Sequence, residues 1–286
     1  MLAPTIDIID AHQFGVPKSG AIYLIRGTSV ALVESGTAVS AERTLAILKT
    51  LAVTPELIFL THIHLDHAGG AGHLARAFPK AKVVVHKRGL RHLADPSRLI
   101  EGVRSASPAL FPHYGEPLPI PEHQLLPVTG GEVFDLGQGV GMEAIATPGH
   151  APHHVCYYER LSRTVFTGDA VGHWNNPVDI PLTVPPRFDL SRSLESLQVL
   201  ANLAPTHLAF THFGIADDAV SHLTEYGEQL IRWFEEIRKL QTSLESADIV
   251  KHILDRPCYR DLVEVEQSAL AMCIRGAILS LETGVA

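Results

Sequence analysis

Four potential metal ligands lie within six residues, directly after a short apolar segment. The segment 57–60 (LIFL) fits a buried strand, and the run HIHLDH follows it one residue later. Side chains alternate along a strand, so His62 and His64 are expected to point the same way where the strand ends. Asp66 and His67 then occupy the expected start of a helix. Imidazoles and carboxylates ligate zinc, iron and manganese, so we predict a metal site at this strand end.

Three further potential ligands follow apolar strands in the same manner. His150 ends the segment TPGH, Asp169 ends TGD, and His212 lies in THFG. Loops held by rigid strands are well suited to fixing ligand geometry. The recurrence of a strand followed by a ligand extends the predicted metal cluster to these positions.

The segments between these ligands alternate between strand and helix patterns. Strands are expected at 21–26, 29–34, 57–60, 81–86, 133–136, 142–147, 154–158, 164–167 and 208–211. Helices are expected at 40–51, 70–78 and 191–203. This alternation predicts a layered α/β architecture.

Two other features divide the chain. Prolines crowd the stretch of about 95–127 too densely for regular structure, which predicts a long insertion of the kind that forms lids or binding loops. Beyond residue 215, apolar spacings of three and four predict helices at 220–243, 247–254 and 262–281. We therefore expect a catalytic domain at 1–215 and a helical region at 216–286 that either covers the substrate or forms a dimer interface.

The composition of the chain excludes some classes of binding partner. The net charge of -8 and the pI near 6.1 argue against nucleic acid, although they leave room for a local basic pocket that takes an acidic small molecule. The first twenty residues lack the pattern of a signal peptide, and no stretch approaches the roughly 18 apolar residues of a membrane span. The three cysteines are odd in number and widely spaced. These features predict a cytoplasmic protein that acts on a small molecule and binds neither membrane nor nucleic acid.

The run HIHLDH, followed in order by TPGH, TGD and THFG, resembles the metallo-beta-lactamase superfamily over residues of about 20–215. The resemblance implies a four-layer αβ/βα sandwich with metals at one edge of the paired sheets, here carrying a C-terminal helical appendage. It also implies one role for each ligand by position. The first metal would be held by His62, His64 and His150, the second by Asp66, His67 and His212, and both by Asp169 as a bridge.

The resemblance implies hydrolysis at two divalent ions, with zinc expected first and iron or manganese as alternatives. A hydroxide that bridges two such ions forms near neutral pH and attacks a carbonyl or a phosphorus atom. Asp66 is given a catalytic role as well, orienting the nucleophile or carrying a proton to the leaving group. His154 resembles a second histidine of glyoxalase-like relatives and is expected to hydrogen-bond a ligand, whereas His153 is expected to face solvent.

Within the superfamily, the sequence is most similar to the glyoxalase II-like branch of thioesterases, lactonases and phosphoesterases. True beta-lactamases are exported and lack a bridging carboxylate. The cations Arg232, Arg238 and Lys239 fit a solvated helix face better than a glutathione site, so hydroxyacylglutathione is not the expected substrate. The alternative is a persulfide dioxygenase with a single iron, which would leave His67 and His212 without a metal.

Candidate substrate contacts lie in the loops that flank the ligands. They are His113 and Tyr114 in the proline-rich insertion, and His173 and Trp174 after Asp169. An aromatic lid of this kind would suit an acyl or aryl group, although the same residues could equally pack a loop against the core. The apolar stripes of the C-terminal helices need burial, and a homodimer is expected because two-fold dimers are the commonest oligomers.

Overall fold

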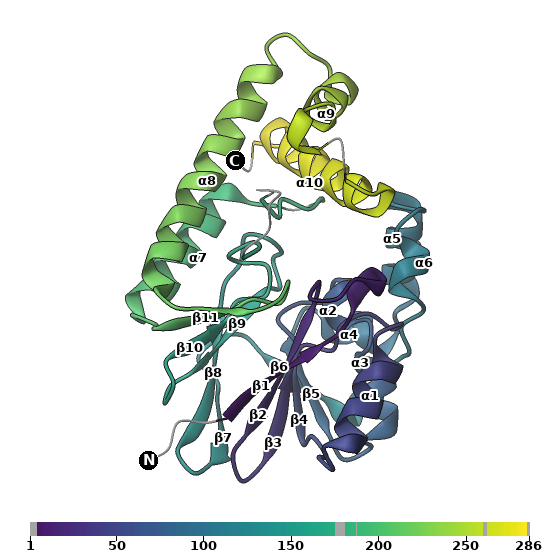
Figure 1. Cartoon of the computed structure of the whole chain (residues 1–286), viewed down its shortest axis with the longest axis vertical. Helices are drawn as coiled ribbons and strands as arrows, with labels where there is room; N and C mark the ends of the chain where they lie inside the picture. Colours follow the sequence, from purple (N-terminus) through teal and green to yellow (C-terminus); the bar gives the residue numbers. More distant parts are fainter. Residues whose placement is uncertain (1–4, 175–180, 187, 260–261, 285–286) are drawn as a thin grey trace.

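The protein is described by a computed structural model that covers residues 5–174, 181–186, 188–259 and 262–284. Two six-stranded sheets face each other, and helices cover their outer sides (Figure 1). The strand orders are β1-β2-β3-β4-β5-β6 and β12-β11-β10-β9-β8-β7. The four-layer αβ/βα sandwich with additional C-terminal helices is therefore confirmed.

The first sheet and its helices come from the first part of the chain. The strands are β1 (Thr5–Asp10), β2 (Ala21–Arg26), β3 (Val30–Val33), β4 (Leu57–Phe59), β5 (Lys82–His86) and β6 (Leu125–Val128). The helices are α1 (Ala41–Thr50), α2 (Leu65–Ala68), α3 (Ala71–Ala77), α4 (Leu90–Ala94), α5 (Ser97–Ala106) and α6 (Phe111–Tyr114). Strands β3 to β6 pair in parallel, so their carboxyl ends meet at one edge of the sheet.

The second sheet and the remaining helices follow. The strands are β7 (Val133–Gly137), β8 (Val140–Ala146), β9 (Val155–Glu159), β10 (Thr164–Phe166), β11 (His207–Ala209) and β12 (Ile215–Ala216). The helices are α7 (Leu190–Asn202), α8 (Ala219–Leu240), α9 (Ser246–Leu254) and α10 (Glu264–Glu282). Strands β10 and β11 pair in parallel, which brings their carboxyl ends together as well.

Strand β2 shows how the sequence builds the layers. Its side chains alternate between faces, and all but the last residue are buried. Ile22 and Leu24 join the cluster beneath α1 and α3, whereas Tyr23 and Ile25 join the cluster between the two sheets. Each fully buried aliphatic side chain of this kind contributes roughly 1.5–3 kcal/mol.

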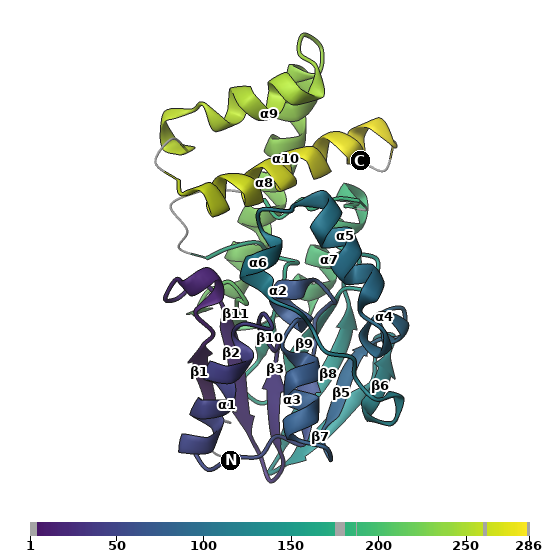
Figure 2. The ribbon, with the colours of Figure 1, turned by 90° about the vertical axis from the view of Figure 1, so that its right-hand side faces the viewer.

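The helices after residue 215 share a core with the second sheet. Leu223, Leu230 and Phe234 of α8 belong to the same buried cluster as Val165 and Leu208 of the sheet. Helices α9 and α10 lie at one end of the sandwich, with α10 beside α5 and α6 and α9 on the far side of α10 (Figures 1 and 2). The division of the chain at 215/216 stays a prediction. Within the described residues, no helix combines the length and the apolarity that crossing a membrane requires.

The stretch 95–127 contains regular structure, so the prediction of an irregular insertion was wrong. Pro96 directly precedes α5, Pro112 lies in the first turn of α6, and Pro127 lies on β6 at the edge of its sheet. At each of these positions a missing backbone N–H removes no essential hydrogen bond. The prolines therefore delimit short elements and do not prevent them. Of the second proline-rich loop, residues 175–180 lie outside the described residues.

Candidate metal centre

The structure brings all the predicted ligands together at the edge where the parallel strands end. They form two groups, within each of which the ligand atoms lie no more than 4.8 Å apart. The first group is His62, His64, His150 and Asp169, and the second is Asp66, His67 and His212. The first group joins residues that follow β4 of one sheet to residues that follow β8 and β10 of the other.

Asp169 lies between the two groups, and its two oxygens face different neighbours. Oδ2 is 3.2 Å from Nε2 of His150 and 3.8 Å from Nε2 of His62. Oδ1 is 3.0 Å from Nε2 of His67 and 3.1 Å from Nε2 of His212. The carboxylate is almost fully buried, so its orientation is set by these contacts. This is the arrangement that a carboxylate shared by two cations requires.

A buried carboxylate that the ligand pattern did not include supports the second group. Oε1 of Glu34 accepts hydrogen bonds from Oγ1 of Thr61 at 2.6 Å and Oγ1 of Thr211 at 3.1 Å, and lies 3.0 Å from Nδ1 of His67. Because Thr61 uses its proton for Glu34, it can only accept at the 3.0 Å contact with Nδ1 of His62. One carboxylate thus fixes two imidazoles. Glu34 directly follows β3, so the strand-then-ligand pattern could have found it.

His150 is oriented from a different direction. Its Nδ1 donates to the carbonyl oxygen of Leu182 at 2.8 Å, which leaves Nε2 as the free ring nitrogen. That Nε2 lies 3.0 Å from Nδ1 of His64, which in turn lies 2.9 Å from Nε2 of His62. The three nitrogens therefore converge, and the outer hydrogen bonds set the tautomers that ligands need.

His154 belongs to neither group and hydrogen-bonds the backbone of a candidate ligand, the kind of contact expected of it. Its Nε2 accepts from the backbone N–H of Asp169 at 3.1 Å, and its Nδ1 lies 2.8 Å from Oγ1 of Thr147. Gly168 makes this contact possible. Its φ is +50°, and a Cβ there would lie 2.5 Å from Nε2 of His154, so the TGD turn needs glycine.

Burial and charge set the protonation of the cluster. Burial holds the pKa of His62 and of His64 well below the usual value, and neighbouring imidazoles act in the same direction. Burial also acts to lower the pKa of His67, but nearby carboxylates, Asp169 foremost, outweigh it and hold that pKa well above the usual value. Burial acts to raise the pKa of Asp169, but the surrounding histidines hold it well below. His62 and His64 are therefore in the neutral form that binds metal, whereas His67 and His212, whose pKa values are raised by Asp169, hold a proton that a bound cation would displace.

The residues present fit metal ions by their chemistry. Nε2 of His67 is buried and has no hydrogen-bond partner, although it lies beside Asp169. A buried nitrogen without a well-formed hydrogen bond is available to bind a cation. The donors around it are imidazole nitrogens and carboxylate oxygens, a set that suits zinc, iron and manganese and does not select among them.

The four predicted substrate residues lie in separate environments, and their role stays a prediction. His113 is exposed on α6, whereas Tyr114 is buried with its ring 5.4 Å from that of Phe14. The ring of His173 lies 4.3 Å from that of His212, and burial together with His212 lowers the pKa of His173 to about 3. Trp174 stacks on the core residue Phe210, with the ring centroids 6.3 Å apart.

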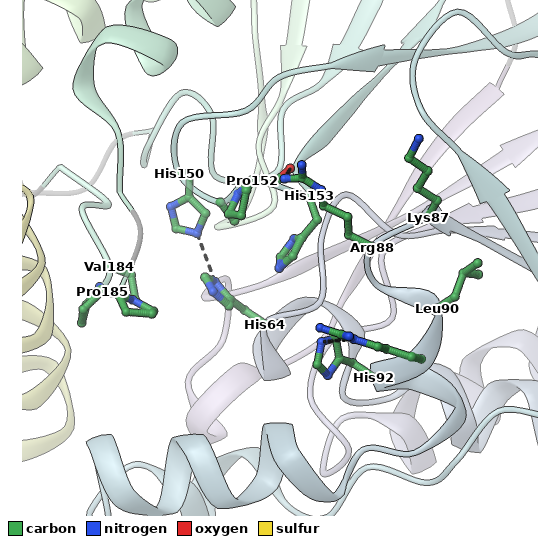
Figure 3. A pocket seen from close by; sticks show the side chains of 13 residues that line it. His64, Lys87, Arg88, Leu90, His92, His150, Pro152, His153, Val184 and Pro185 are labelled. Carbon is green, nitrogen blue, oxygen red and sulfur yellow. Dashed lines mark hydrogen bonds between the residues drawn. The ribbon is translucent and has the colours of Figure 1, made fainter. Parts of the chain in front are cut away.

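A pocket of about 720 Å³ opens beside the first group of ligands and is lined by His64 and His150 (Figure 3). His153 lines it too, so the prediction that this side chain faces solvent was wrong. Its Nδ1 is buried, and burial together with His150 lowers the pKa of its imidazole to about 4. The turn that carries His150 directs His153 inward, which the sequence pattern did not reveal.

Comparisons with known proteins agree with the observed fold. A family model described as the metallo-beta-lactamase superfamily matches residues 15–212. The metallo-beta-lactamase fold-containing protein ST1585 of Sulfurisphaera tokodaii is 34% identical over 180 residues, 62% of this chain and 66% of that protein. Its crystal structure superposes with a TM-score of 0.73 at 25% identity, covering 97% of this chain and 99% of the other.

Two further relatives are more distant. The metallo-beta-lactamase family protein TTHA1429 of Thermus thermophilus has a TM-score of 0.68 at 22% identity, over 93% of this chain and 89% of its own. An atrochrysone carboxyl ACP thioesterase of Aspergillus fumigatus is 30% identical over 147 residues, 51% of this chain and 34% of the thioesterase. The matched segments thus span between 34% and 66% of the two relatives found by sequence, ST1585 and the thioesterase.

Proposed function

The chain belongs to the metallo-beta-lactamase superfamily, and we propose that it is a hydrolase that uses two divalent metal ions to cleave an ester-type bond in a small molecule. The bond is a thioester, a lactone or a phosphoester. Zinc is the first candidate for both ions, with iron or manganese as alternatives.

The orientation of Asp169 is the observation that carries this proposal. A single metal would need only one of its oxygens, yet each oxygen faces a different set of histidines. The second group, Asp66, His67 and His212, offers three potential ligands of its own and meets the first group at Asp169. A mononuclear iron centre, as in a persulfide dioxygenase, would leave His67 and His212 of this group without a metal.

The proposed roles follow from these positions. Bound at the two groups, divalent cations lower the pKa of a water molecule to about 7 and stabilise negative charge on the reacting oxygen. The side chain of Asp66 keeps 17% of its surface exposed, whereas that of Asp169 keeps 4%. Asp66 can therefore take a proton from the nucleophile and pass it to the leaving group. Asp169 stays ionised and contacts both ligand groups, which fixes their relative position.

Among the three bonds, the thioester has additional support. The similarity to the Aspergillus fumigatus thioesterase covers 51% of this chain. True beta-lactamase activity has no comparable support, because the proposed bridging carboxylate sets this chain apart from that branch. We therefore place thioesters first among the substrates to test.

Elemental analysis of the protein purified without added metal tests the proposal. About two ions per chain, whether zinc or a mixture of zinc and iron, are expected, followed by hydrolysis of at least one thioester, lactone or phosphoester. A single iron per chain, with no second ion taken up from added zinc or manganese, would overturn the proposal. Persulfide oxidation would then be the activity to measure.

A further inference from the structure

The pocket beside the first ligand group carries an unusual concentration of positive charge. Besides His64 and His150, its lining includes Lys87, Arg88 and Arg91, from the end of β5 and the start of α4. No aspartate or glutamate is among its lining residues. The chain as a whole has a net charge of -8, so this local excess of cations runs against the overall balance.

These cations have no carboxylate partners among the described residues. Nη1 of Arg88 donates to the carbonyl oxygen of Pro152 at 3.3 Å, and Nε of Arg91 lies 3.2 Å from Nε2 of His92. Most of their donor capacity is therefore left for another group. Six other arginines among the described residues do pair with acids, and Arg26–Asp7, Arg160–Glu143 and Arg232–Glu228 are examples.

The position of the cations relative to the candidate ligands indicates which part of a substrate they would contact. In Figure 3, His64 and His150 lie between Val184 on one side of the pocket and Lys87 on the other. The volume of about 720 Å³ lies within the range of pockets that enclose small molecules, so it holds more than an ester group alone. A substrate whose reacting bond lies at the ligands would therefore extend toward Lys87, Arg88 and Arg91.

We propose that the pocket binds an anionic substrate, an ester whose non-reacting part carries a phosphate or a carboxylate that contacts Lys87, Arg88 and Arg91. The proposal rests on the proposed hydrolase function and adds the chemical class of its substrate. Guanidinium groups match the geometry of both anions, and the ammonium group adds a point charge. Anion binding here would also steer charged substrates toward the site of an otherwise acidic protein.

Equilibrium binding tests this without requiring turnover. Benzylphosphonate, the carboxylate anion of phenylacetic acid and neutral benzyl alcohol, none of which has a hydrolysable ester bond, are titrated by calorimetry into the holoenzyme and into a variant with Lys87→Gln and Arg91→Gln, whose metal content is checked. Arg88 is retained because it also contacts Pro152. At least one anion is expected to bind the native protein more tightly than the alcohol, with an affinity that falls with salt and drops about tenfold or more in the variant. The ratio of the dissociation constants of the two anions shows which one the pocket prefers.

A matched control removes similar charge elsewhere. Arg238→Gln with Lys239→Gln changes one arginine and one lysine on the exposed face of α8, and its anion affinity should equal that of the native protein. Equal affinities in all three proteins, or equal binding of anions and alcohol, would overturn the inference.

Hydrolysis assays separate the proposed anion binding from the proposed hydrolase function. Loss of anion binding in the pocket variant without any esterase activity would leave this inference standing and remove the proposed reaction, whereas esterase activity with uniform binding would do the reverse.

Discussion

At the residue scale, the candidate ligands and the supporting contact of His154 could be predicted from the sequence, whereas Glu34 was not predicted. The HIHLDH run is recognisable as a candidate metal site because its residues are neighbours in sequence, and the later candidate ligands repeat the same position after a strand. Glu34 acts through Thr61 and His67 of one segment and Thr211 of another, which only the fold brings together around it. Contacts of this kind leave a weak trace in the sequence.

The first prediction concerns Asp169. Asp169→Ala removes the carboxylate that faces both groups, so the variant should retain less than about half of its metal and lose at least a hundredfold in hydrolysis. Metal content by elemental analysis and kcat/KM for the best ester are the measurements. Asp135→Ala, at an exposed position of β7, should change neither quantity. Native metal content in Asp169→Ala would refute the bridging role.

A second prediction concerns Glu34. Glu34→Gln keeps the size of the side chain but replaces the charged acceptor that Thr61 and His67 share. Metal affinity should fall roughly 10–100-fold, as it does when a residue that orients a ligand is lost. Competition with a zinc-binding dye measures it. Glu159→Gln is the control, because Glu159 is equally buried but its oxygens accept from Leu161 and Ser162, away from the cluster. Equal effects of the two changes would mean that Glu34 contributes only to folding.

At the element scale, one short segment connects the C-terminal helices to the metal centre. The carbonyl oxygen of Leu182 accepts from His150, and the backbone N–H of Leu182 donates to Oη of Tyr226 on α8 at 3.3 Å. Next to it, Oγ1 of Thr183 donates to the carbonyl oxygen of Cys273 on α10 at 2.7 Å. A Cβ at Gly276 would lie 1.7 Å from the carbonyl oxygen of Thr183, so only glycine allows this approach. The sequence predicted both helices but not this contact, because proline-rich segments carry no periodic pattern.

This segment gives the third prediction. Thr183→Val removes a buried hydrogen bond that costs roughly 1–3 kcal/mol when lost, and it loosens the backbone that orients His150. Metal affinity and kcat should fall together by several-fold. Thr224→Val, which removes a hydrogen bond on the exposed face of α8, is the matched control and should leave both unchanged. If Thr183→Val lowered stability alone, the C-terminal helices would not be coupled to the centre.

At the scale of the whole molecule, the order of motifs was sufficient to predict the sandwich. It was not sufficient for the pocket, because Lys87, Arg88 and Arg91 form no recognisable motif and come to line one pocket only in the folded structure. For the proline-rich stretch 95–127, the sequence instead led to a wrong prediction, that of an irregular insertion. Its prolines are compatible with α5, α6 and β6 because each takes a terminal or edge position, which composition alone cannot show.

The last prediction follows from the position of the candidate metal centre between the two sheets. His62 and His64 follow a strand of the first sheet, whereas His150, Asp169 and His212 follow strands of the second, so bound metal would link both sheets. A ligand that binds only the folded state at a thousand times its Kd stabilises it by about 4 kcal/mol. Removing metal with a chelator should therefore lower the Tm by on the order of 10 °C, and added zinc should restore it. Differential scanning calorimetry measures the change, and Asp169→Ala is the control, since a protein that binds little metal should barely respond. An unchanged Tm in the native protein would show that the sheets hold together without the centre.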